Sequence, residues 1–96
     1  MASIDITHHG IPGRFLTEVD GHVANLDYEM DDGVMHIIHT RVPDAIGGRG
    51  IAGRLVEAAF HHARQEGWKV RPLCTYAAAW VGRHPEYRDL VAAPPG

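Results

Sequence analysis

Four glycines stand in the short stretch G-G-R-G-I-A-G at residues 47–53, directly before an amphipathic segment. Backbone N–H groups at the start of a helix bind anions, because they lack intrahelical partners and the helix dipole is positive there. Residues 48–53 also spell G-x-G-x-x-G, the fingerprint of dinucleotide-binding loops. The stretch therefore predicts a phosphate site, and the elements around it must decide which phosphate binds.

Hydrophobic patterning predicts how this stretch is positioned. Apolar and polar residues alternate in three segments, and Asp-Gly pairs between them predict hairpins because these residues tolerate positive φ. A helical period then begins at Ile51, and Gly67 is its stop signal. The three predicted strands are residues 14–19, 22–30 and 34–42.

The remaining segments are shorter. Ile4 and Ile6 predict a weak strand, followed by a turn in H-H-G-I-P-G. Residues 68–74 predict a further strand, which Pro72 bends or places at an edge. Residues 75–84 and 85–90 are expected to be helical, and the last six residues are expected to form a tail.

The predicted order of the main elements is β-β-β-α-β-α. It corresponds to an α/β (α+β) fold class, in which an antiparallel meander leads into a β-α-β-α unit with a mixed sheet. We expect a single domain over residues 1–96, with a core from about 14 to 91. His36 lies three residues before His39 and is expected on the opposite sheet face if the strand is regular.

Two common phosphate-binding folds fit the glycine stretch poorly. A dinucleotide-binding fold needs an acidic residue near the end of the next strand to bind the ribose. The segment K-V-R-P-L-C (residues 69–74) has none, and antiparallel hairpins precede the loop. The Lys-Ser/Thr pair of a P-loop is absent as well. The phosphate of another ligand is therefore favoured.

The stretch from Arg41 onward resembles the acyl-CoA pyrophosphate loop of the GCN5-related N-acetyltransferases (GNAT), whose signature is [QR]-x-x-G-x-[GA]. Aligned on its glycines, the signature covers residues 45–50, with Ala45 where the family has Gln or Arg. Arg49 is the candidate that supplies the missing charge. H-T-x-V-P, P-x-C and R-H-P-E-Y follow in order and are similar to a small, minimal branch of the family, so the resemblance covers residues from about 14 to 91.

The resemblance implies an abbreviated GNAT fold and transfer of an acyl group from acetyl-CoA, as co-substrate, to an amine. Backbone groups of the loop would bind the pyrophosphate, Val42 would orient the acyl carbonyl, and Tyr76 would border the groove. The implied cofactor-binding residues are Val42, Gly47, Gly48, Arg49, Gly50, Ile51, Ala52 and Tyr76.

Cys74 and His39 are the catalytic candidates. A thiolate at Cys74 could attack the thioester and carry the acyl group, although a lone cysteine is also commonly a small buried hydrophobic residue. His39 is the best general-base candidate, with a structural histidine over the sheet as the alternative. No metal site is expected, because the chain has one cysteine and no H-E-x-x-H motif.

Composition limits the class of protein. The chain has 96 residues, a formal net charge of −3 and no apolar run long enough to span a membrane, so we expect neither nucleic-acid nor membrane partners. We expect a cytoplasmic enzyme that binds CoA and an unidentified amine or protein acceptor. Acidic residues at 27, 29, 31 and 32 either attract an amine or form a solvated face. The alternatives are a non-catalytic CoA-binding module and a nucleotide-phosphate-binding interaction domain.

Overall fold

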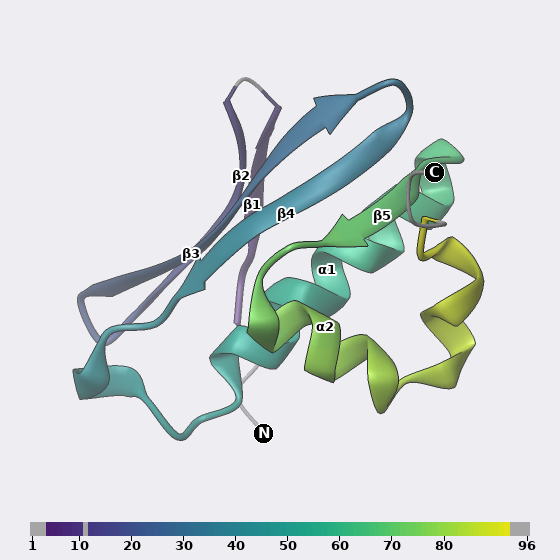
Figure 1. Cartoon of the computed structure of the whole chain (residues 1–96). Helices are drawn as coiled ribbons and strands as arrows, with labels where there is room; N and C mark the ends of the chain where they lie inside the picture. Colours follow the sequence, from purple (N-terminus) through teal and green to yellow (C-terminus); the bar gives the residue numbers. More distant parts are fainter. Residues whose placement is uncertain (1–3, 11, 93–96) are drawn as a thin grey trace.

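One mixed sheet organises the molecule in the computed structural model, which describes residues 4–10 and 12–92. Its strand order is β1-β2-β3-β4-β5, and neighbours are antiparallel except for the parallel pair β4–β5. This sheet and the helix between β4 and β5 confirm the predicted fold class (Figure 1). The strands are β1 (Thr7–Gly10), β2 (Gly13–Val19), β3 (His22–Asp31), β4 (Val34–Arg41) and β5 (Lys69–Pro72).

Two tight hairpins connect β2, β3 and β4. Asp20 and Gly21 have φ of 51° and 77°, and Asp32 and Gly33 have φ of 52° and 76°. A two-residue turn with positive φ at both positions matches the right-handed twist of the strands that it joins. The Asp-Gly signals therefore did locate the hairpins, and the first turn places Arg14 opposite Asp27.

The N-terminal strand differs from the prediction. Ile4 and Ile6 precede β1, which instead contains His8 and His9 from the predicted turn. The ring of His8 stacks on Phe15, with centroids 4.3 Å apart and planes within 8°. This contact between neighbouring strands outweighs the local turn signal in H-H-G-I-P-G, whose Ile11 lies outside the described residues.

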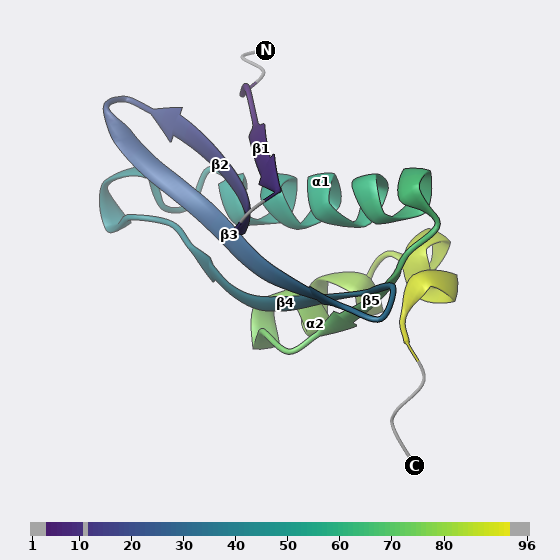
Figure 2. The ribbon, with the colours of Figure 1, turned by 90° about the horizontal axis from the view of Figure 1, so that it is seen from above.

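Helix α1 (Ile51–Glu66) lies along one face of the sheet, as Figure 2 shows. Its amphipathic face packs on the inward side chains of β2, β3 and β4, which is why the helical period of the sequence identified it. Helix α2 (Thr75–Gly82) packs beside α1, where Phe60 and Trp80 stack with centroids 5.5 Å apart. Short 3-10 helices occupy Asp44–Ile46 (η1) and Pro85–Leu90 (η2). The fully buried core includes Leu26, Met35, Ile37, Leu55, Val56 and Phe60.

A β-bulge at Ile38 interrupts β4. Tyr28 of β3 pairs with Ile37, but the preceding Asp27 pairs with His39, so β4 has one extra residue. His36 and His39 consequently share the face of the sheet opposite α1, together with Asp27. The expectation that the two histidines occupy opposite faces is wrong, because the strand is not regular.

The bulge also marks where β4 and β5 part. Their parallel pairing covers only residues 34–37 and 69–72. The N–H groups of Leu73 and Cys74 then both donate to the carbonyl of Ile37, at 3.1 Å each. Beyond Ile37, the side of β4 that faces β5 continues without a paired strand.

The chain returns to the sheet after η2. Val91 forms a parallel bridge with Val70, and the N–H of Ala92 donates to the Val70 carbonyl at 2.8 Å. The predicted tail therefore begins with ordered contacts, and the rest of it lies outside the described residues. Among the described helices, none combines the length and hydrophobicity needed to span a bilayer.

Candidate functional site

The glycine loop connects the end of β4 with the first turn of α1. Gly48 and Gly50 have φ of 78° and 76°, a left-handed conformation that glycine adopts without steric cost. A Cβ added at either position would meet no heavy atom within 4 Å. The backbone conformation thus explains both glycines, and the space beside the loop is open.

Helix α1 begins without a cap. Gly50 provides no side chain, and the first turn contains no acidic residue. The first intrahelical bond runs from the N–H of Arg54 to the carbonyl of Gly50, at 3.2 Å. The N–H groups of residues 51–53 consequently have no intrahelical acceptor, which makes this end of the helix suitable for an anion.

The predicted cofactor-binding residues lie in two places. Val42 directly follows β4, residues 47–52 lead from η1 into the first turn of α1, and Tyr76 lies on α2. A Cβ at Gly53 would approach the Tyr76 hydroxyl at 3.3 Å and Trp80 Nε1 at 3.5 Å. Gly53 therefore permits close packing of α1 against α2, and this packing brings Tyr76 beside the first turn of α1.

Arg49 is engaged by the first hairpin. Its guanidinium Nη1 lies 2.6 Å from Oδ2 of Asp20, and both side chains are largely exposed. The sequence suggested that Arg49 supplies the charge missing at Ala45. In the structure, this charge is paired with a carboxylate instead of pointing freely into the space beside the loop.

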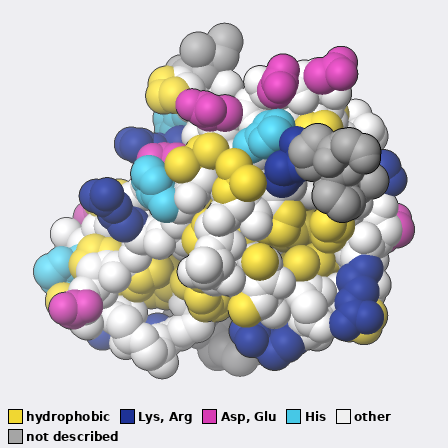
Figure 3. Space-filling view, viewed as in Figure 1, with side chains coloured by type: hydrophobic (Ala, Val, Ile, Leu, Met, Phe, Trp, Pro, Cys, Tyr) yellow, Lys and Arg dark blue, Asp and Glu magenta, His cyan; other side chains and the backbone are white. Residues whose placement is uncertain are grey.

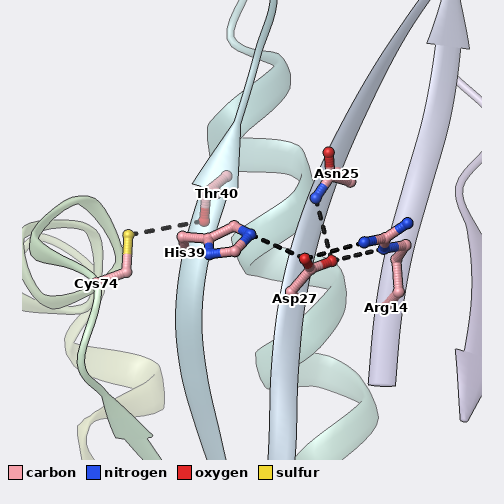
Figure 4. A network of polar contacts seen from close by, with 6 residues as sticks. All are labelled: Arg14, Asn25, Asp27, His39, Thr40 and Cys74. Carbon is pink, nitrogen blue, oxygen red and sulfur yellow. Dashed lines mark hydrogen bonds and ion pairs between the residues drawn. The ribbon is translucent and has the colours of Figure 1, made fainter. Parts of the chain in front are cut away.

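His39 belongs to a polar network on the sheet face opposite α1 (Figure 4). Its Nε2 lies 2.8 Å from Oδ2 of Asp27. Arg14 donates to both oxygens of Asp27, at 2.6 Å and 3.1 Å, and Asn25 donates at 3.1 Å. Asp27 is therefore the centre of the network and holds the imidazole in place.

The ionised carboxylate of Asp27 determines which nitrogen of the neutral His39 imidazole carries the proton. Hydrogen bonding from Arg14, the largest cause, lowers the pKa of Asp27; burial opposes this, and Asn25 reinforces it. An ionised carboxylate can only accept, so Nε2 of His39 must be the donor. The neutral imidazole then has its lone pair on Nδ1, which is the nitrogen available for proton transfer.

Cys74 directly follows the loop after β5 and is the N-cap residue of α2. The strand ends two residues earlier than expected, at Pro72. The half-buried thiol donates to the hydroxyl of Thr40 at 3.8 Å. Figure 4 shows the thiol on one side of β4 and the imidazole of His39 extending toward Asp27 on the other, so the two catalytic candidates do not form a pair.

The partners of His39 are not evident from the sequence. Asp27 stands there in an acidic run, and no motif assigns a role to Arg14 or Asn25. The two-residue turn between β2 and β3 was a usable signal, because it fixes Arg14 opposite Asp27. No group of His, Cys, Asp and Glu side chains suited to a metal ion occurs among the described residues.

Comparisons with known proteins agree with this fold. A family model described as GCN5-related N-acetyl-transferase matches residues 14–90. Protein NATD1 from Homo sapiens and from Gallus gallus is 38% identical to this chain over 52 residues, which is 54% of this chain. The match spans about half the length of these relatives, 46% of the human and 47% of the chicken protein. The NMR structure of a GCN5-like protein from Staphylococcus aureus is 26% identical with a TM-score of 0.74, covering 99% of this chain and 94% of that one.

Proposed function

Because the chain belongs to the GCN5-related N-acetyltransferase family, we propose that it transfers an acetyl group from acetyl-CoA to an amine. One observation carries the proposal. β4 and β5 part at the Ile38 bulge, and the same strand β4 then leads into the uncapped start of α1. This arrangement provides an unpaired strand for an extended ligand and, directly beyond it, N–H groups for its phosphates.

The loop accounts for binding of the CoA moiety. The N–H groups of Ile51 and Ala52 would donate hydrogen bonds to pyrophosphate oxygens. The open space at Gly48 and Gly50 leaves room for the phosphate groups. The unpaired part of β4 up to Val42 would hold the pantetheine arm and orient the acyl carbonyl. Tyr76, with its side chain beside the start of α1, would border this path.

The network around Asp27 supports general-base catalysis by His39. When the amine nitrogen bonds to the acyl carbon and the carbon–sulfur bond breaks, the amine loses one proton and the departing thiolate gains one. Nδ1 of His39 would accept the first proton, while Asp27 remains ionised and stabilises the imidazolium. Return of this proton to the thiolate, directly or through water, restores the neutral imidazole.

The contacts of Cys74 favour direct transfer over an acyl-cysteine intermediate. A nucleophilic thiol needs a base or a nearby cation to form the thiolate. The imidazole of His39 bonds to Asp27, and the hydroxyl of Thr40 is the polar partner of Cys74 in the described part of the chain. We therefore propose that Cys74 lines the path of the acyl group and does not carry it.

Acetyl transfer can be tested by incubating the protein with acetyl-CoA and a set of primary amines, while measuring free CoA thiol and acetylated product. We expect transfer by the wild type and by Cys74→Ala, with no acetyl adduct in the intact mass of the protein. An adduct that disappears in Cys74→Ala, together with loss of transfer, would instead establish the covalent route. CoA binding without transfer to any amine would indicate a non-catalytic CoA-binding module.

The placement of the pyrophosphate can be tested with two glycines at opposite ends of α1. Gly50 and Gly67 both have φ of 76° and open space at the Cβ position. Alanine at either position forces a similar strain, roughly 1–2 kcal/mol of unfolding free energy. We expect similar losses of thermal stability in Gly50→Ala and Gly67→Ala but weakened CoA binding in calorimetry only for Gly50→Ala. Equal CoA affinity in the two variants would show that the pyrophosphate binds elsewhere.

A further inference from the structure

A cavity of about 210 Å³ adjoins His39 on the sheet face opposite α1. We propose that this cavity is the acceptor site and that it selects a primary alkylammonium group on an unbranched aliphatic chain. The inference rests on the proposed acetyl transfer and adds the location and chemistry of the second substrate. The residues that carry it are Pro12, Arg14, Asp27, Glu29, Ile38 and His39.

The charge of the cavity favours a cation. Arg14 and Asp27 neutralise each other through two hydrogen bonds. Glu29 follows two residues later on the same face of β3 and makes no side-chain hydrogen bond or ion pair with the described residues. Its carboxylate is therefore the uncompensated charge of the cavity, which attracts an ammonium group and disfavours an acceptor that carries a carboxylate.

The shape of the cavity favours a slender chain. Its volume lies below the roughly 300–1,000 Å³ of pockets for drug-sized ligands, so it suits one aliphatic stem. Pro12 and the bulge residue Ile38, of which 38% is exposed, provide apolar surface for methylene groups. Figure 3 shows basic, acidic and histidine side chains gathered near hydrophobic surface on the part of this face formed by β2 to β4.

The position of the cavity suits the transfer step. His39 lines the cavity, and the bulge beside it is the point where β4 leaves β5. The cavity therefore adjoins the part of β4 along which the acyl group is proposed to lie. The bound ammonium first releases one proton to water; the resulting amine attacks the acyl carbon, its second proton passes to Nδ1 of His39, and the CoA thiolate departs.

Glu29→Gln tests the recognition of charge, with Glu18→Gln as its control. Glu18 is an exposed carboxylate on the same sheet face but lies outside the cavity. With Nα-acetyl-lysine amide as the probe acceptor, we expect Glu29→Gln to raise the KM for the amine about three- to fivefold, as an exposed ion pair allows. The KM for acetyl-CoA and kcat should not change, and Glu18→Gln should match the wild type. Unchanged amine KM in Glu29→Gln would overturn the inference while leaving acetyl transfer intact.

Binding can be measured without turnover by titrating ¹⁵N-labelled protein with n-butylammonium chloride. We expect the largest amide shift changes at Gly13, Ile38 and His39, weaker binding to Glu29→Gln, and no comparable changes with sodium butyrate. Shifts that cluster elsewhere, or equal effects of butyrate, would overturn the ammonium site. Absence of acetyl transfer to every amine would overturn the proposed function and the acceptor role together.

Discussion

The side chain of Asp27 decides which nitrogen of His39 can act as a base. Its oxygens receive hydrogen bonds from Arg14 and Asn25, and the lowered pKa keeps the carboxylate ionised. This arrangement contributes little to stability, because the contacts lie at a partly exposed surface. Asp27 is therefore expected to govern the proposed chemistry of His39 by fixing its tautomer, and it also lines the proposed acceptor cavity.

Asp27→Asn should impair acetyl transfer without removing the fold. The amide can present its NH₂ group to Nε2 of His39, which favours the tautomer with the proton on Nδ1 and removes the base from the substrate side. We expect kcat to fall by roughly a hundredfold or more, as loss of a general base does. Steady-state kinetics at saturating acetyl-CoA and amine would measure this fall in kcat.

Asp31→Asn is the matched control for this substitution. Asp31 lies on the same face of β3 and has no contact with His39. Its substitution removes the same charge but leaves the His39 tautomer unchanged, so kcat should stay near the wild-type value. An equal fall in kcat in the two variants would show that the negative charge of strand β3 matters for transfer and that the tautomer of His39 does not.

The Arg49–Asp20 ion pair is expected to oppose CoA binding. Exposed pairs of this kind contribute at most about 1 kcal/mol, so a polyanionic ligand can break this one at small cost. Asp20→Asn should release Arg49 and remove a negative charge near the loop, and thereby tighten CoA binding about two- to fivefold. Calorimetry at low and high salt should show the gain shrinking as salt screens it.

Asp32→Asn provides the control, because Asp32 occupies the equivalent turn position with nearly the same φ, 52° against 51°. Asparagine tolerates this backbone conformation at both sites. CoA affinity should not change in Asp32→Asn. If Asp20→Asn instead weakened CoA binding, Asp20 would be orienting Arg49 toward the phosphates.

At the scale of elements, turns were readable from the sequence but the bulge was not. Asp20-Gly21 and Asp32-Gly33 identify two-residue turns, and such turns set the register of Arg14 against Asp27. The same reasoning would pair Asp27 with Ile38, since an uninterrupted hairpin has no extra residue. The bulge places His39 opposite Asp27 instead, because Ile38 faces outward while Ile37 and Thr40 keep their inward contacts. No residue type near Ile38 indicates a bulge.

A titratable side chain, His8, connects strand β1 with α1 and β3. His8 stacks on Phe15, hydrogen-bonds with the hydroxyl of Tyr28 and lies 4.3 Å, centroid to centroid, from the ring of His62. Burial is the main cause that lowers the pKa of His8; His62 and His9 lower it further, and Glu66 opposes them. Protonation of His8 is therefore less favourable in the folded than in the unfolded chain.

The consequence is a loss of stability in mild acid. Above the ordinary pKa of 6.5, His8 is neutral in both the folded and the unfolded chain, and its packing contributes fully to stability. As pH falls below 6.5, the unfolded chain binds the proton first, so the free energy of unfolding decreases. Thermal unfolding between neutral and mildly acidic pH should show a smaller decrease in His8→Phe than in the wild type. His61→Phe, an exposed histidine on α1, should keep the wild-type pH dependence. Parallel curves for His8→Phe and the wild type would contradict this role of His8.

Across the whole molecule, the elements that follow from patterns over many residues could be predicted from the sequence, whereas those held by a few isolated contacts could not. The three-stranded meander, α1 and the parallel return to β5 follow from hydrophobic periodicity and turn residues over many positions. β1 and the docking of Val91 depend on a few contacts between distant segments. The single-domain organisation and the minimal branch of the family stay predictions, as do the roles of Cys74 and His39.

The bridge between Val91 and Val70 has a further consequence for association between molecules. β5 is the last strand of the sheet, and an unpaired outer strand offers hydrogen-bonding groups to strands of other chains. Ala92 occupies one such group, the carbonyl of Val70. Pro72, which lacks an N–H group, further limits strand addition.

Ala92→Pro should remove this protection, because proline cannot donate to Val70, and the extended backbone of Val91 (φ −67°, ψ 125°) is compatible with a following proline. We expect concentration-dependent self-association of Ala92→Pro in size-exclusion chromatography with light scattering. Ala92→Gly keeps the N–H group and should elute like the wild type, whereas identical behaviour of both variants would refute the idea. The backbone of Val91 and Ala92 would then act as an intramolecular competitor that keeps β5 from pairing with strands of neighbouring molecules.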